Sequence, residues 1–264
     1  MAPDPARSDD RPIDGGQPTP PALLLLADGR FPSGGHAHSG GLEAAAGMEG
    51  VHGIAALELF LRGRLDTVGV VAAAFAAAAC AAFREAVSRS DTTAGLDGDS
   101  RQSGPADTRT TIEQLDLEFD ARCPSPVLRT TSRRLGRQLL RAGRAAWPHP
   151  VLDAPASSPG RGPHQPVALG AVAAAARLQP DAAALAAAHD AVTGPATAAV
   201  RLLSLNPFTV HAVLARLGSQ VHAVAADGAR YAGTAPADLP ARAGPLLDVS
   251  AEHHATWEVR LFAS

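Results

Sequence analysis

Apolar residues recur at helical spacing along most of the chain, whereas the alternation typical of strands is scarce. The clearest example follows Asn206 and Pro207, an N-cap residue and a proline at the first helical position, after which the apolar residues share one helix face. The pattern predicts an all-α fold, a single Ala-rich helical bundle of about eight to ten helices. Further helices are predicted over 54–66, 68–88, 112–121, 127–146, 167–178, 181–203 and 249–262.

The segments between these helices are rich in Gly, Pro, Ser, Thr and Asp, which predicts loops over 89–110, 148–166 and 228–245. Residues 1–21 contain six prolines among Asp and Arg and no basic stretch followed by an apolar core. This composition predicts a disordered tail over 1–21 and argues against a secretory signal. We therefore expect one all-α domain over 22–264.

Alanine makes up much of the apolar set in a chain of 264 residues that is 46% hydrophobic, which is large enough to bury one sizeable core. Small side chains let helix axes approach closely, so a bundle of this composition gains contact area without long side chains. The longest apolar run, 68–83, is mostly alanine and shorter than the roughly 18 to 20 residues that cross a bilayer. It is predicted to be a buried core helix, with no membrane as a partner.

The charge balance argues against nucleic-acid binding, because that function needs many clustered cations and the formal net charge here is −3. The two cysteines, Cys80 and Cys123, form no C-x-x-C pair and no disulfide framework. A reducing compartment is the simpler interpretation.

A glycine-rich segment over 32–43 breaks the local rules of this Ala-rich chain. Four glycines fall within eight residues just before a predicted helix start, and each costs about 1 kcal/mol relative to alanine inside a helix. Such glycines indicate backbone that adopts unusual dihedral angles or is closely approached by other backbone. Ser39 is the predicted N-cap of the following helix, and Glu43 is favoured near the positive end of that helix.

Three motifs, at the beginning, middle and end of the chain beyond the tail, carry a family resemblance. P-x-G-G-x-x-x-S-x-G-L-E over 32–43 resembles the N-terminal signature of the UreF family of urease accessory proteins. The end of the chain, HATWEVRLFAS over 254–264, is similar to that family's H-E-x-x-Y-x-R-L-F-x-S. SRRLGRQLL over 132–140 resembles its mid-chain S-R-R-x-G-R-x-L-L. Together they are spread over essentially the whole chain beyond the tail.

The resemblance implies a non-enzymatic, cytoplasmic all-α factor that takes part in inserting nickel into urease. It implies an adaptor or chaperone that binds the accessory protein UreD, also called UreH, recruits the GTPase UreG for the urease apoprotein, and forms a homodimer within that complex. It implies neither a cofactor nor a metal site of its own. The implied partner-binding residues are Pro32, Gly34, Gly35, His36, His38, Ser39, Gly41, Leu42, Glu43, Trp257, Arg260, Leu261, Phe262 and Ser264.

The residue types near the end of the chain fit this role and also fit a plainer one. Trp257, Arg260, Leu261 and Phe262 combine the aromatic, aliphatic and arginine side chains that anchor protein interfaces. The same side chains are equally suited to docking the last helix on its own bundle. The sequence leaves both interpretations open.

Two rival functions start from the same glycine-rich segment. The sequence AHSGG over 37–41 differs at one residue from the G-x-S-x-G nucleophile elbow, which would make Ser39 the nucleophile of a serine hydrolase. That motif needs a preceding strand and a sheet, and the pattern predicts neither. His36 and His38 are close enough in sequence to bind one nickel ion from a loop. Two ligands alone make a labile site, and two solvated side chains are the alternative.

A row of arginines follows the predicted helix 127–146 at about one helical turn per step, at 133, 137, 141 and 144. The row is either a solvated face or a surface that docks against acidic groups. Those groups belong either to a partner or to the neighbouring acidic segment, 113–120. RNA is a further occupant of such a row, although the overall charge argues against it.

Overall fold

The computed structural model describes residues 20–48, 50–93, 105–153 and 162–263. Over these ranges the chain forms ten α-helices and no strand beyond one isolated bridge, so the all-α prediction is confirmed. The helices are α1 (Pro21–Ala27), α2 (Leu42–Met48), α3 (Gly53–Arg64), α4 (Val70–Thr93), α5 (Pro105–Ala121), α6 (Pro126–Ala146), α7 (Gln165–Ala175), α8 (Pro180–Leu202), α9 (Pro207–Ala229) and α10 (Pro245–His254).

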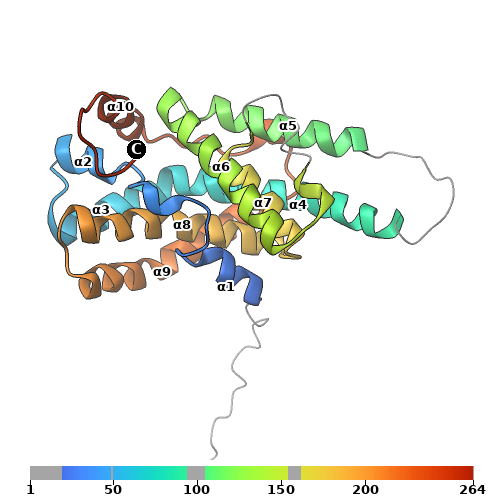
Figure 1. Cartoon of the computed structure of the whole chain (residues 1–264), viewed down its shortest axis with the longest axis horizontal. Coiled ribbons are helices and arrows are strands. Elements are labelled where there is room, and N and C mark those ends of the chain that lie inside the picture. The colour runs from blue at the N-terminus through green and yellow to red at the C-terminus, as the bar shows by residue number, and fades with distance from the viewer. Residues whose placement is uncertain (1–19, 49, 94–104, 154–161, 264) are drawn as a thin grey trace, which may run out of the picture.

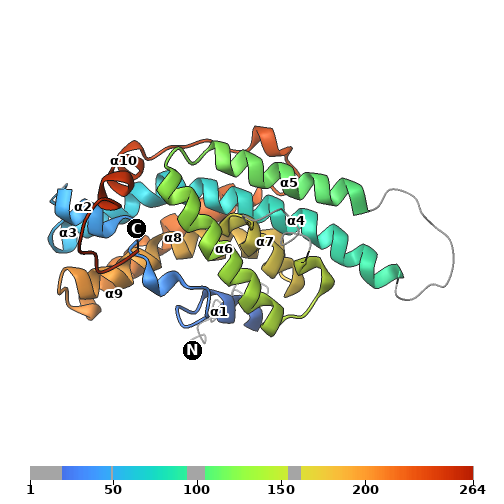
Figure 2. The same cartoon turned by 45° about the horizontal axis from the view of Figure 1, so that its top comes forward.

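Helix α4 runs through the bundle and packs against α5, α7, α8 and α9, while α6 packs on α7 (Figure 1). Helices α2 and α10 lie together at one end of the bundle, as both views show (Figure 2). Segments from opposite ends of the sequence therefore meet there, and the last residues of the chain run back across the first.

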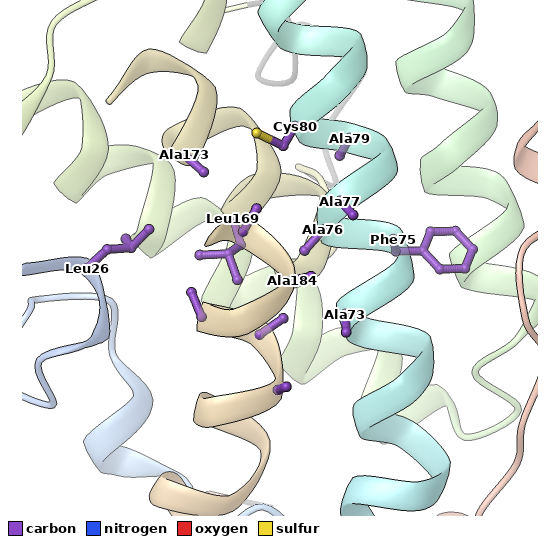
Figure 3. Close-up of a cluster of buried hydrophobic side chains, with 14 of the residues drawn as sticks. Leu26, Ala73, Phe75, Ala76, Ala77, Ala79, Cys80, Leu169, Ala173 and Ala184 are labelled. Carbon is purple, nitrogen blue, oxygen red and sulfur yellow. The ribbon is translucent and has the colours of Figure 1, made fainter. Parts of the chain in front are cut away.

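The core is built from small side chains, as expected from the composition. Figure 3 shows alanines of α4, with Cys80, beside Leu169 and Ala173 of α7. At Gly170 of α7 an added Cβ would lie 2.5 Å from the Cβ of Ala79, so α4 and α7 approach at a distance that only glycine permits. Close packing of this kind adds contact area to that of the larger buried side chains, such as Phe75 and Phe83.

Helix α3, a π-helical turn at Leu65–Gly69 and α4 form one continuous helical run. By length and composition alone, residues Gly53–Arg89 are apolar enough to cross a membrane, but 67% of the most apolar window is buried inside the bundle. This burial is typical of a core helix, as predicted for 68–83.

The helix ends follow local signals closely. Asn206 caps α9, because its Oδ1 accepts a hydrogen bond from the amide of Phe208 (2.8 Å), and Pro207 is the first helical residue. Helices α4 and α5 extend further than predicted and shorten the expected loop 89–110 to the part between them. Helix α1 begins at Pro21, so nearly all of the expected tail lies outside the described residues. Cys80 and Cys123 are both free thiols.

One arginine of the predicted row belongs to a buried polar network between α5, α6 and α7. Arg133 pairs with Asp116 (2.7 Å) and Asp120 (2.8 Å), which confirms docking against the acidic segment at this position. His164 is fully buried, and its Nε2 lies 3.0 Å from Oδ1 of Asp120. Burial raises the pKa of Asp120, but hydrogen bonds with Arg133 and His164 outweigh this effect and hold the pKa below its ordinary value.

Candidate functional site

The glycine-rich segment takes the backbone conformations that its composition predicts. Gly34, Gly40 and Gly41 have φ values of 86°, 59° and 88°, in the left-handed region that favours glycine. These turns take the chain through a 3-10 helix at Gly35–Ala37 and into α2. The segment is therefore a shaped turn between α1 and α2, as expected.

Close contacts from two other helices hold this turn in place. An added Cβ at Gly40 would lie 2.8 Å from Cγ of Pro195, which is inside α8. Arg64, at the end of α3, donates hydrogen bonds to the carbonyl of Gly40 (2.5 Å) and to that of Ala191 (3.2 Å). The turn is thus fixed against the bundle from both sides.

Ser39 supports the start of α2 and is not presented to solvent. Its side chain is fully buried, and its Oγ accepts a hydrogen bond from the amide of Glu43 (3.2 Å), in keeping with the predicted role at the helix start. No strand precedes it in the described part of the chain, so the setting of a nucleophile elbow is absent there.

Glu43 joins the two ends of the described chain. It is buried, with 7% of its surface exposed, and its carboxylate accepts hydrogen bonds from the amides of Leu261 (2.8 Å) and Phe262 (2.9 Å). Nε2 of the buried His254 lies 3.1 Å from the same carboxylate. A carboxylate that binds two backbone amides makes strong, directional contacts.

The end of the chain corrects one prediction. The helix expected over 249–262 ends at His254, and residues 257–263 are not helical. The physical reason is tertiary: the amides of Leu261 and Phe262 donate to Glu43, and the amide of Ala263 donates to the carbonyl of Ala37 (2.9 Å), in place of helical acceptors. An isolated parallel bridge joins His38 and Ala263. We call these contacts between Ala37–Glu43 and His254–Ala263 the terminal clasp.

Trp257 closes the clasp over α2. Its ring lies 4.8 Å from that of His254, and its Nε1 donates a hydrogen bond to Nδ1 of His253 (3.0 Å). An added Cβ at Gly47 would lie 2.4 Å from the Trp257 ring, so the indole occupies space that any other residue at 47 would fill. Phe262 is buried and lies under Arg201, whose guanidinium is 5.4 Å from the ring centroid.

The predicted partner-binding residues differ in how far they are buried. His38, Ser39, Gly41, Leu42, Glu43 and Phe262 are buried, and they hold the bundle and its clasp together. Pro32, His36, Arg260 and Leu261 are exposed, while Gly34, Gly35 and Trp257 are half-buried. Ser264 lies outside the described residues. Partner binding by these residues, buried or exposed, stays a prediction.

His36 and His38 lie on the rim and the wall of one groove next to the clasp. His36 is exposed and His38 is buried. Among the described residues no group of three or more His, Cys, Asp or Glu side chains is arranged to hold a metal ion. The pair therefore gives little support to a nickel-binding protein.

Helix α10 also fastens the clasp to α6. Ser125 caps α6 through its Oγ, which accepts from the amide of Leu128 (3.1 Å), and its hydroxyl donates to Glu252 of α10. The amide of Val127 also donates to Glu252 (3.0 Å). The Ser125 hydroxyl and this amide hold the pKa of Glu252 below its ordinary value.

Three residues of this region escape sequence reasoning. Arg64 and Arg201 reach the glycine turn and Phe262 from helices distant in sequence. Nε2 of His254 faces the carboxylate of Glu43, 211 residues earlier in the chain. No local signal marks these contacts, because each joins residues far apart in the chain.

Comparison with known proteins places the chain in a family. A family model described as UreF matches residues 51–218, which is more than half of the chain. The chain belongs to the UreF family. The mid-chain motif SRRLGRQLL lies inside the matched UreF region, whereas both sides of the terminal clasp lie outside it.

Curated UreF relatives extend the match over most of the chain. The protein named urease accessory protein UreF from Mycobacterium sp. (strain JLS) is 41% identical over 242 residues, which are 92% of this chain and 97% of the relative. The protein of that name from Mycobacterium marinum is 40% identical over the same shares. The one from Mycobacterium tuberculosis (strain H37Rv) is 36% identical over 232 residues, 88% of this chain and 92% of the relative.

Proposed function

We propose that this chain is a urease accessory protein that takes part in inserting nickel into urease. It acts without catalysis of its own, as a cytoplasmic adaptor that binds UreD (UreH) and recruits the GTPase UreG to the urease apoprotein. Membership of the UreF family and the names of its relatives support the role in urease maturation. The named partners follow from the resemblance and are the finer part of the proposal.

The terminal clasp is the observation that carries the adaptor role. Glu43 and the bridge at His38 hold the end of the chain in an extended form, and this leaves Leu261 with 67% of its surface exposed beside the exposed Arg260. An aliphatic side chain and an arginine on a fixed backbone are the kind of anchor that protein interfaces use, because little conformational entropy is lost on binding.

Two surface substitutions, one at the end of the chain and a control on α3, test the adaptor role without unfolding the bundle. Tagged full-length protein is used to capture UreD and UreG, and it is compared with Leu261→Ser and with a truncation that lacks residues 257–264. Leu59 on α3 is 70% exposed, so Leu59→Ser is a matched control. We expect Leu261→Ser and the truncation to lose partner protein and Leu59→Ser to retain it. Equal retention by all variants would remove the end of the chain from the proposal.

Deletion in the native host tests the role in maturation itself. Urease activity is expected to fall at ordinary nickel supply and to recover in part with excess nickel. Fully active urease in the deletion strain would contradict the proposal. Esterase turnover by the purified chain that is lost on Ser39→Ala would instead favour a hydrolase.

A further inference from the structure

A basic groove runs between the first turns of α6, the 3-10 helix at Gly35–Ala37 and the end of the clasp. Its volume is about 790 Å³, and no aspartate or glutamate is among the described residues that line it. Three arginines and two histidines line it together with threonine, apolar and small residues. The lining residues are His36, Ala37, His38, Pro126, Val127, Thr130, Thr131, Arg134, Arg201, Arg260, Leu261, Phe262 and Ala263.

The three arginines of the groove come from three separate elements. Arg134 is on α6, Arg201 is at the end of α8 and Arg260 is on the extended end of the chain. None of them forms an ion pair with a carboxylate in the described part of the protein. Arg133, which precedes Arg134 on α6, faces inward and pairs with two aspartates. The fold thus satisfies the inward arginine and leaves a cluster of like charges facing the groove.

Like charges gathered on one surface repel one another, and an anionic occupant relieves this repulsion. Glu252 of α10 is the nearby carboxylate. It accepts a hydrogen bond from the amide of Val127 in the first turn of α6. It is not among the groove's lining residues. The groove itself is therefore complementary to negative charge brought by another molecule.

The length of the groove favours a peptide over a small anion. The lining residues of α6 extend from Pro126 to Arg134, which is about 12 Å along the helix at about 1.5 Å per residue. An extended chain advances about 3.3 Å per residue, so about four residues fit this length. The apolar side chains of Val127 and Leu261 line the same groove and suit an occupant that carries an aliphatic residue as well as carboxylates.

We propose that this groove is the docking site for an extended acidic segment of a partner protein, whose carboxylates pair with Arg134, Arg201 and Arg260. The inference rests on the proposed function for the nature of the partner, a protein of the maturation complex. It adds the chemistry by which that partner is held. Arg134, which the motifs at the two ends of the chain do not include, becomes a partner-binding residue.

A peptide of defined charge tests the groove directly. The probe is a fluorescein-labelled Glu-Leu-Glu-Glu-Leu-Glu peptide, and the control probe is its Gln-Leu-Gln-Gln-Leu-Gln counterpart. Binding to the full-length protein is measured by fluorescence anisotropy. We expect the acidic peptide to bind at least about tenfold more tightly than the control, and to weaken as NaCl rises from about 0.05 to about 0.5 M.

Arg134→Gln is the decisive variant, because Arg134 is exposed and makes no ion pair with the described residues. This variant is expected to bind the acidic peptide about tenfold more weakly than wild type, while Arg134→Lys keeps most of the binding. Arg141→Gln on the same helix is the matched control, since Arg141 is exposed and does not line the groove. Equal binding by Arg134→Gln and wild type, or equal binding of the two peptides, would overturn the proposal.

Other occupants give distinct results. Full displacement of the peptide by millimolar inorganic phosphate would identify a small-anion site, and tighter Arg134-dependent binding of a single-stranded RNA would identify a nucleic-acid site. Either result overturns the proposal. Capture of UreD and UreG separates this inference from the proposed function. If Arg134→Gln captures both proteins as well as wild type does, the docking proposal is wrong and the adaptor role stands. If the acidic peptide binds but wild type captures neither protein, the adaptor role is wrong.

Discussion

Removal of the Glu43 carboxylate is the most direct perturbation of the terminal clasp. In Glu43→Ala the amides of Leu261 and Phe262 lose their acceptor, and His254 loses the carboxylate 3.1 Å from its Nε2. A hydrogen bond to a charged group contributes about 1.5 to 3 kcal/mol. The two amide bonds together therefore favour the docked end of the chain by at least about 3 kcal/mol, which corresponds to at least about a hundredfold in the equilibrium between docked and released states.

Amide hydrogen exchange measures this equilibrium at the affected residues. The amides of Leu261 and Phe262 are expected to exchange at least about a hundredfold faster in Glu43→Ala than in wild type, whereas the amides of α4 keep their protection because the core is unchanged. Trp257 fluorescence in a Trp147→Phe background should shift to the red as the indole leaves Gly47. Glu85→Ala on the surface of α4 is the control, since Glu85 is exposed and its ion pair with Arg89 is long, at 3.9 Å. Unchanged exchange at both amides would refute the reasoning.

Two further predictions concern the bundle. Gly170→Ala is expected to lower the free energy of unfolding by about 1 to 3 kcal/mol in urea denaturation, because the new Cβ would meet the amide nitrogen of Cys80 at 2.6 Å; unchanged stability would show that α4 and α7 separate freely. Burial lowers the pKa of His164 against the raising influence of Asp116 and Asp120 and alongside the lowering influence of Arg133. Since the unfolded chain takes up this proton near pH 6.5 and the folded chain resists it, stability should fall as the pH drops below about 6.5, and His164→Gln should flatten that part of the profile.

Local signals predicted most of the bundle, because helix periodicity and caps act over a few residues. Asn206 with Pro207 predicted the start of α9 correctly. The glycines at 34, 40 and 41 predicted the turn in which all three take left-handed φ values. The same reasoning extended the last helix to 262, where nothing local marks its end at His254. The amide of Leu261 is instead bound by Glu43, which lies 218 residues away in sequence.

The residues of the candidate site were predictable from sequence motifs, but their contacts within the chain were not. The motifs at the two ends of the chain named Glu43 and Phe262 as partner-binding residues, whereas the structure buries both in contacts within the chain. Arg134 belongs to the mid-chain motif, but only the structure shows that it lines one groove with Arg201 and Arg260. Sequence spacing cannot show which unpaired charges converge from different helices.

The order in which the chain is synthesised gives the clasp a further consequence. Glu43 leaves the ribosome long before Leu261 and Phe262 are made, so the clasp can form only after synthesis has passed these two residues. A product that stops short of these residues keeps the core yet never displays the fixed Arg260 and Leu261. Such fragments would not compete with molecules that carry the clasp for the proteins that recognise this end.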